Sequence, residues 1–120
     1  MGDFFVIMEV KKMREEYRVK KAAEFQKIMG ARRFKNTKAF TVYINRKTKN
    51  HSRYGIAAPK KLGNAVVRNK TKRQIRSMLQ DINMFDTPYD YIVLVRKKYY
   101  EQSYEENRKD LENLIKTVKM

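Results

Sequence analysis

The segment 60–76 carries the side chains whose types and spacing point most directly to a chemical partner. On a helical wheel of ~100° per residue, its polar side chains gather on one arc, beside an apolar stripe that can pack on a sheet. The arc holds Arg68, Asn69, Lys72, Arg73 and Arg76. Cations four residues apart can each meet one phosphate, and an arginine can donate two hydrogen bonds to the same phosphate. The pattern predicts a helix that binds a polyanion, and the alternative is a solvated helix face.

No set of side chains predicts a protein active site. A nuclease needs a nucleophile with a base, or clustered carboxylates that hold metal ions. The one histidine, His51, has no carboxylate near it in the sequence. All acids lie before Phe25 or after Gln80, so a metal site would need a pairing in space, such as Glu24 with Asp81. We therefore expect no catalytic residue, no metal ligand and no cofactor bound by this chain alone.

The net charge of +16 is concentrated in the middle of the chain. The stretch from Phe25 to Gln80 holds 16 Lys and Arg and no Asp or Glu, and the two ends are balanced. Unbroken positive charge repels itself on folding, so it usually serves to meet a polyanion. Nucleic acid, an acidic membrane surface and an acidic protein are the candidate partners. We expect no membrane contact, because the basic arc lacks the Leu, Phe or Trp face that inserts into a bilayer.

The elements that must position these residues fit one domain, since the chain has 120 residues. We assign the domain to residues 13–120 and take residues 1–12 as a separable N-terminal extension, with a short docking strand as the alternative. Helical periodicity predicts helices over 21–29 and 64–81, the second with Asn64 as its N-cap. A third helix follows the capping box that Ser103 opens. The absence of cysteine favours a reducing compartment, which we take to be the cytoplasm.

Three further segments have the patterns of strands. Residues 39–45 alternate, with Phe40, Val42 and Ile44 on one face and Tyr43 on the other. Residues 53–58 form a second strand, and the polar stretch 46–51 reads as a hairpin loop between the two. The apolar run 91–95 is typical of a central strand. A short edge strand near 17–19 is also expected, and the order of elements predicts an α+β sandwich.

The segment 60–76 resembles the signature of the bacterial ribonuclease P protein component. It contains a lysine pair, a Leu-Gly-Asn-Ala-Val run and an Arg-Asn-Lys element, followed by the basic helix. Three more pieces occur in the family's order, at residues 18–21, 24–27 and 40–43. The resemblance covers the chain from about residue 17 to the C-terminus.

The resemblance implies a function and a fold. Members of the family form a ribonucleoprotein with a large catalytic RNA, which removes the 5′ leader of precursor tRNA with the help of Mg²⁺ held with the RNA subunit. The implied partners are the catalytic ribonuclease P RNA and precursor tRNA, with no obligate protein partner. The implied fold is a two-layer α/β sandwich with a small mixed sheet and an unusual left-handed βαβ crossover, of the type seen in domain 2 of ribosomal protein S5. The implied RNA-binding residues are Lys60, Lys61, Asn64, Arg68, Asn69, Lys70, Lys72, Arg73 and Arg76.

The family's leader-binding cleft falls on Phe25 and Tyr43. Without the resemblance, a Phe on a short helix is most often a core residue and a Tyr on a strand is most often half-buried packing. Aromatic side chains are also the usual platforms for single-stranded bases. The chain departs from the family at Lys70, where many members have arginine, and at Met29, where an aromatic is common. The alternative function is an RNA-binding module of another kind, such as a ribosomal protein.

Overall fold

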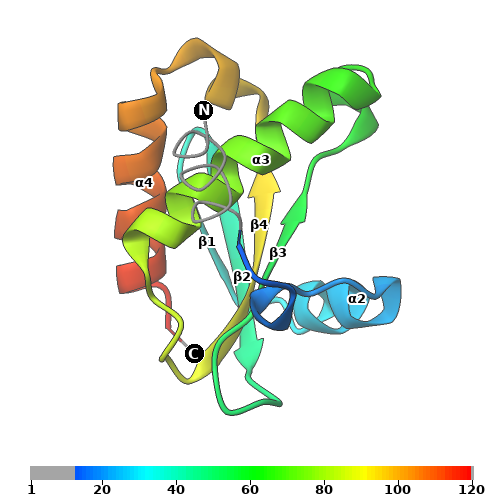
Figure 1. The fold of residues 1–120 in the computed structure, drawn as a ribbon, viewed down its shortest axis with the longest axis vertical. Helices are drawn as coiled ribbons and strands as arrows, with labels where there is room; N and C mark the ends of the chain where they lie inside the picture. The colour runs from blue at the N-terminus through cyan, green and yellow to red at the C-terminus, as the bar shows by residue number, and fades with distance from the viewer. Residues whose placement is uncertain (1–12, 120) are drawn as a thin grey trace, which may run out of the picture.

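Residues 13–119, which the computed structural model describes, fold around a four-stranded sheet (Figure 1). The strands are β1 (Phe34–Asn36), β2 (Phe40–Arg46), β3 (Tyr54–Ala57) and β4 (Tyr89–Val95). The helices are α2 (Ala22–Gly30), α3 (Ala65–Ile82) and α4 (Tyr104–Thr117). Short 3₁₀ turns cover Glu15–Tyr17, Lys60–Leu62 and Lys97–Glu101. The prediction for residues 1–12 lies outside the described residues.

The sheet has the strand order β1-β2-β4-β3. β4 pairs antiparallel with β2 and parallel with β3, so the predicted central strand is confirmed. The predicted hairpin at 46–51 is wrong, because β4 lies between the two strands that this loop connects. The physical reason is the apolar run of β4, in which Ile92 and Val93 point to opposite faces and are both fully buried. Because the backbone N–H and C=O groups of such a strand are shielded from water, they need hydrogen-bond partners in a strand on each edge. The expected edge strand near 17–19 is a single parallel bridge between Arg18 and Tyr54.

The connection from β3 through α3 to β4 is left-handed. β3 and β4 are parallel neighbours, and when α3 lies in front of the sheet, β4 lies to the left of β3 (Figure 1). This handedness is rare among parallel connections. The α+β class, the mixed sheet and the unusual crossover all agree with the expectation from the sequence.

The two long helices begin where the capping residues predicted. Asn64 Oδ1 accepts a hydrogen bond from the Val67 backbone N at 3.0 Å and caps α3. The preceding Gly63 has a φ of 152°, a conformation that side-chain-bearing residues rarely adopt. At the start of α4, Ser103 and Glu106 exchange both hydrogen bonds of a capping box.

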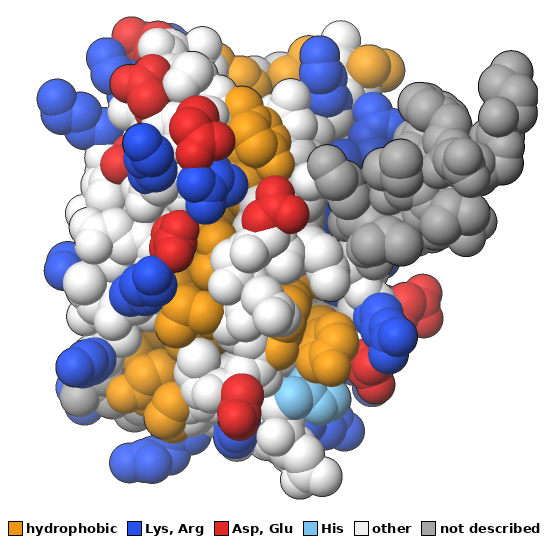
Figure 2. Space-filling view, turned by 60° about the vertical axis from the view of Figure 1, so that its left-hand side comes forward, with side chains coloured by type: hydrophobic (Ala, Val, Ile, Leu, Met, Phe, Trp, Pro, Cys, Tyr) orange, Lys and Arg blue, Asp and Glu red, His pale blue; other side chains and the backbone are white. Residues whose placement is uncertain are grey.

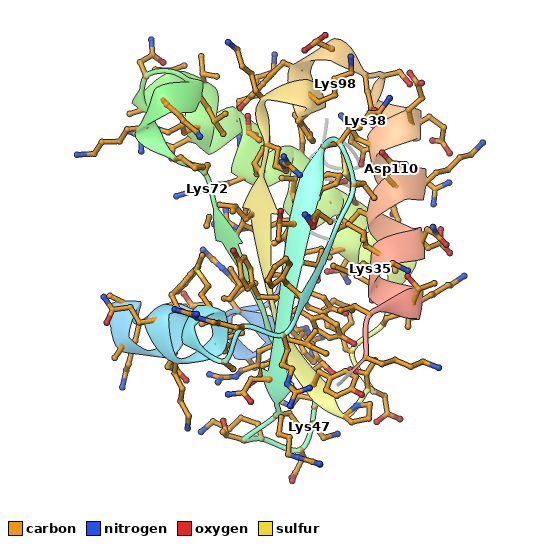
Figure 3. All side chains as sticks on the ribbon, turned by 180° about the vertical axis from the view of Figure 1, so that it is seen from behind. Lys35, Lys38, Lys47, Lys72, Lys98 and Asp110 are labelled. Atoms are coloured by element: carbon orange, nitrogen blue, oxygen red, sulfur yellow. The ribbon has the colours of Figure 1, made fainter. Side chains whose placement is uncertain are left out.

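Both faces of the sheet are apolar, and different helices cover them. Phe40, Val42 and Ile44 belong to the main core with α3 and α4, as the alternation predicted. On the opposite face, α2 packs on a smaller cluster around Val19, Ile28 and Ile92. Seen from behind, α2 crosses only one end of this second face (Figure 3). Among the described residues, no helix crosses the rest of this face (Figure 3).

The surface over α4 mixes its charges. Acidic and basic side chains alternate on the side of the molecule that carries this helix (Figure 2). Glu112 pairs with Lys116 at 2.7 Å and with Arg108 at 3.2 Å. The surplus of positive charge lies elsewhere, in the stretch from Phe25 to Gln80, which includes most of α3 and holds no acidic residue.

Candidate nucleic-acid interface

The predicted polar residues of α3 separate into two rows in the structure. Arg68, Lys72 and Arg76, spaced four residues apart, are half-buried along the flank of the helix. The outward-facing row is exposed and consists of Asn69, Lys70 and Arg73. The buried stripe of the helix holds Thr71, Ile75, Met78 and Leu79. The sheet thus fixes the rotation of α3 and leaves both rows accessible from one side.

The residues before α3 play two kinds of role. Lys60 and Lys61 are exposed in the 3₁₀ turn that leads into the helix. Leu62, between them and the helix, packs against the core and anchors the turn. Asn64 uses its side-chain oxygen as the helix cap, and only its exposed amide nitrogen is free to meet a ligand.

A groove runs between α2 and the end of β3. Phe25 on α2 and the apolar end of β3 provide its hydrophobic surface, and Lys20 and Lys72 provide its charge. The groove is lined by Lys20, Ala22, Phe25, Gln26, Ile56, Ala57, Ala58, Pro59 and Lys72. A basic groove that also carries an aromatic ring is the kind of surface that holds single-stranded nucleic acid.

The Phe25 ring lies directly on the sheet at Gly55. A Cβ atom placed on Gly55 would be 2.6 Å from Cζ of Phe25 and 2.7 Å from Cδ1 of Ile92. Any side chain larger than hydrogen at this position would therefore displace the ring. The ring remains partly exposed, so its position on the sheet is fixed while one side is accessible.

Tyr43 belongs to the same apolar layer but not to the lining of the groove. In the sheet register, Phe34, Tyr43, Ile92 and Gly55 form one row across all four strands. The Phe25 ring sits over one end of this row. Tyr43 packs its ring against Phe34, with the two centroids 5.3 Å apart. The sequence thus placed Phe25 and Tyr43 on the same face of the sheet, and the structure separates them by the width of β4.

A buried arginine fixes the position of α2. Arg53 Nη2 donates to Glu24 Oε2 at 2.7 Å and to Asp90 Oδ2 at 3.1 Å. Asp90 is 2% exposed, and its Oδ1 accepts the backbone N–H of Arg53 at 3.0 Å. The hydrogen bond from Arg53 lowers the pKa of Glu24 despite its partial burial. Burial alone would lower the pKa of Arg53, but its bonds to Glu24 and Asp90 outweigh burial and raise it.

This network was not predicted, because its three members are far apart in the sequence and follow no spacing rule. The network also pairs two carboxylates, those of Glu24 and Asp90, with the Arg53 cation. Glu24 accepts a hydrogen bond from Arg53. Within residues 13–119, no group of three or more His, Asp or Glu side chains could hold a metal ion. His51 Nε2 lies 2.7 Å from the Glu16 carbonyl oxygen, and its ring packs on Tyr17.

Two cations outside the predicted set, Arg18 and Lys20, line the same region as α3. They border a pocket of about 280 Å³ together with Lys72 and Arg76. The signal in the sequence was the alternation of Arg18, Val19 and Lys20 in the expected edge strand, which puts both cations on one side. None of the described helices is long and apolar enough to span a membrane.

The comparisons with known proteins agree with this geometry. The family model described as Ribonuclease P matches residues 13–119. A ribonuclease P protein component from Mesoplasma florum is 41% identical over 105 residues, which cover 86% of this chain and 96% of that protein. One from Streptococcus mutans is 36% identical over 108 residues, covering 90% and 91%.

Solved structures of RNase P proteins also superpose on this chain. The RNase P protein of Staphylococcus aureus superposes with a TM-score of 0.75 at 36% identity, covering 83% of this chain and 93% of that one. The RNase P protein from Thermotoga maritima superposes with a TM-score of 0.74 at 25% identity, covering 89% and 100%. With a family match over nearly the whole chain and relatives above 30% identity, this chain belongs to the ribonuclease P protein family.

Proposed function

We propose that this subunit of ribonuclease P binds the single-stranded 5′ leader of precursor tRNA in the groove beside Phe25, while the basic rows of α3 contact the catalytic RNA. The observation that carries the proposal is the composition of the groove. A partly exposed aromatic ring, fixed on the sheet at Gly55, lines the groove together with Lys20 and Lys72. Stacking on the ring and pairing of the backbone with the cations would grip a strand without reading its sequence.

We assign catalysis to the RNA subunit and the Mg²⁺ held with it. The chemistry of the protein's own groups supports this division. Glu24 and Asp90 are both bonded to Arg53, so their charge is already compensated by a cation. The charge of α3 suits phosphates, which a large RNA offers in number. We place the complex in the cytoplasm, with its tRNA substrates.

The alternative of a ribosomal-type RNA-binding module makes a different prediction for the groove. Such a module would bind RNA whether or not a free 5′ leader is present. The family match over residues 13–119 favours the ribonuclease P assignment.

Removing the Phe25 ring tests the proposal. A stacking contact contributes about 1–3 kcal/mol per base, which is roughly a five- to hundredfold change in affinity. Phe25→Ala should therefore weaken binding of precursor tRNA to the reconstituted holoenzyme and leave mature tRNA, which lacks the leader, nearly unchanged. Tyr43→Ala should have a smaller effect of the same kind, because Tyr43 lies outside the groove lining.

Tyr104→Ala is the matched control, since Tyr104 is an exposed aromatic at the start of α4. It should change neither affinity. If Phe25→Ala instead weakens both tRNAs equally and lowers the melting temperature, Phe25 is a core residue and the groove has no leader-binding role.

A further inference from the structure

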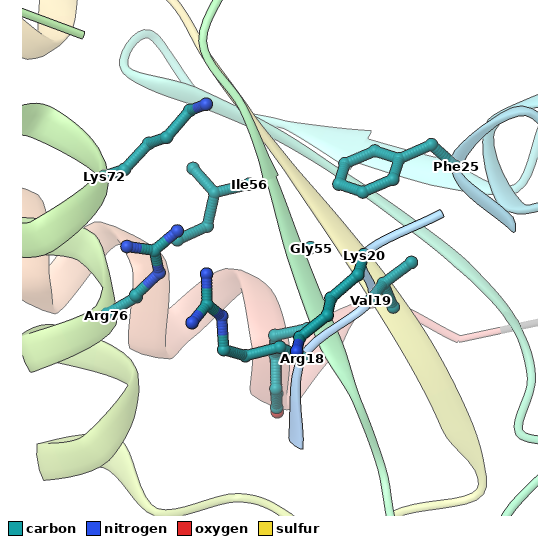
Figure 4. A pocket seen from close by; sticks show the side chains of 9 residues that line it. Arg18, Val19, Lys20, Phe25, Gly55, Ile56, Lys72 and Arg76 are labelled. Carbon is teal, nitrogen blue, oxygen red and sulfur yellow. The ribbon is translucent and has the colours of Figure 1, made fainter. Parts of the chain in front are cut away.

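The two flanks of α3 have different neighbours. Lys72 and Arg76 project from one flank towards β3, on the side of the leader groove (Figure 4). Two residues along an α-helix turn by about 200°, so Gln74 points away from both of them. The 3₁₀ turn Lys97–Glu101 packs on this second flank, where the Tyr99 hydroxyl donates to Gln74 Oε1 at 2.8 Å. A ligand of the second flank therefore approaches α3 from the side away from the groove.

Tyr100 places an exposed aromatic ring on the second flank. It is 43% exposed, and its hydroxyl lies 2.8 Å from Thr71 Oγ1. Thr71 donates its own proton to the Val67 carbonyl oxygen at 2.9 Å, so Tyr100 is the donor in this pair. The Tyr100 ring also packs edge-on against Tyr99, which is buried, with the two centroids 5.3 Å apart. A hydrogen bond and a buried neighbour thus hold the ring in place while part of it stays accessible.

Two lysines and an exposed valine stand beside this ring. Lys97 lies three residues before Tyr100, a spacing that puts both side chains on one side of the 3₁₀ turn. Lys70 lies one helical turn before Gln74, on the same flank of α3. Both lysines are exposed, and within residues 13–119 neither of them forms an ion pair. We call this set of four residues the tyrosine patch: Val67, Lys70, Lys97 and Tyr100.

The tyrosine patch has the composition of a nucleotide contact. Every nucleotide supplies a flat ring together with a negative charge, so an unpaired nucleotide matches an accessible ring flanked by lysines. Glu101, which follows the ring in the sequence, pairs with Lys98 at 3.1 Å, so its charge is already compensated. A bilayer is a poorer match, because one ring and one valine bury too little apolar surface for insertion.

We propose that Tyr100 stacks on an unpaired base of the catalytic RNA, while Lys70 and Lys97 contact the neighbouring phosphates. Lys70 belongs both to the tyrosine patch and to the outward-facing row of α3, so an RNA bound along that row reaches the patch without a break. The leader, which the groove would hold at Phe25, lies on the other flank of the helix. The proposal rests on the proposed contact between α3 and the catalytic RNA.

The first test is assembly of the full chain with a bacterial ribonuclease P RNA in the absence of tRNA. Tyr100→Ala should weaken assembly by roughly fivefold or more, the loss expected for one stacked base. Tyr100→Phe keeps the ring and should assemble nearly as the wild type does. Tyr100→Leu keeps apolar volume without an aromatic face and should resemble Tyr100→Ala. Phe34→Ala is the matched control and should not change assembly, because Phe34 is an exposed ring on the opposite face of the sheet.

The variants also separate stacking from a structural role. If Tyr100 acted only through its hydrogen bond to Thr71, Tyr100→Phe would lose as much assembly as Tyr100→Ala, and that result would overturn the proposal. Wild-type assembly of Tyr100→Leu would overturn it as well. Lys97→Gln should flatten the dependence of log affinity on log salt by about one unit, since it removes one phosphate contact. Tyr100→Ala should leave this slope unchanged, because the ring carries no charge.

The second test identifies the occupant of the patch. Chemical probing of the catalytic RNA should reveal unpaired nucleotides that the wild type protects and Tyr100→Ala does not. The affinity of the assembled holoenzyme for precursor tRNA should be the same for both proteins. A loss of precursor tRNA binding without a loss of assembly would assign the ring to the substrate and overturn the proposal, as would identical protection by both proteins.

Arg73→Gln, in the outward-facing row of α3, tests the proposed function separately. If Arg73→Gln flattens the salt slope while Tyr100→Ala assembles as the wild type does, α3 contacts the catalytic RNA and the tyrosine patch does not. If neither change affects assembly, the contact of α3 with the catalytic RNA fails together with the patch.

Discussion

The contact between Phe25 and Gly55 makes a quantitative prediction for one added methyl group. Gly55→Ala places a Cβ atom 2.6 Å from Cζ of Phe25 and 2.7 Å from Cδ1 of Ile92. Carbon atoms in contact prefer about 3.5–4.0 Å, so the ring has to move by roughly 1 Å. We expect this shift to lift the ring from the sheet and to disturb the groove.

Two terms of opposite sign set the size of the effect on stability. Overpacking a well-filled site costs about 1–3 kcal/mol. Replacing a glycine within a strand by alanine raises the free energy of unfolding by about 0.5–1 kcal/mol, because it reduces the conformational freedom of the unfolded chain. The net result for Gly55→Ala is a loss of roughly 0–2.5 kcal/mol in the free energy of unfolding.

A double-mutant cycle isolates the contact. In a Phe25→Ala background the ring is absent, so the Gly55→Ala change should cost about 1 kcal/mol less than in the wild type. Urea unfolding of the four proteins measures this, with Gly30→Ala as the control, because a Cβ on Gly30 meets nothing within 4 Å. Additivity of the two changes within about 0.5 kcal/mol would show that the ring does not rest on Gly55 and would refute this description of the groove.

Three further predictions concern the network of Arg53 and the cap of α4. Arg53→Met leaves Asp90 buried without its cation, so the free energy of unfolding should fall by about 3–5 kcal/mol; a loss below 1 kcal/mol in urea unfolding would contradict the network. Because the bond from Arg53 lowers the pKa of Glu24 from its usual 4.5, Glu24 stabilises the fold above that pH and loses its contribution as the pH falls. The stability difference between wild type and Glu24→Gln should therefore shrink below pH 4.5, and a constant difference would argue against the ion pair. Ser103→Ala removes the cap of α4 and should cost about 1 kcal/mol, and an unchanged urea midpoint would show that the capping box contributes nothing.

Local signals in the sequence predicted the long elements well. The cap at Asn64 and the capping box at Ser103 fixed the starts of two helices, because these residues satisfy backbone groups within their own turn. The run 91–95 identified the central strand by its lack of alternation. These features depend on neighbours in the sequence, so a single sequence contains them in full.

Features that depend on distant residues were predicted less well. The short, polar loop 46–51 has the pattern of a hairpin, although a central β4 needs a strand on each side. β1 has three exposed residues and no apolar alternation, so nothing in its sequence distinguishes it from a loop. The contact of Phe25 with Gly55 and the network of Arg53 arise only when α2 packs on the sheet, and no spacing rule connects them.

The central claim, that the protein acts on precursor tRNA through a catalytic RNA, is tested most directly by reconstitution. The protein is mixed with a bacterial ribonuclease P RNA and precursor tRNA at limiting Mg²⁺, and release of the 5′ leader is followed over time. We predict cleavage at the mature 5′ end when RNA and protein are both present, much slower cleavage with the RNA alone, and none with the protein alone. Specific cleavage by nuclease-free protein without RNA, or no stimulation of the RNA by the protein, would contradict the account.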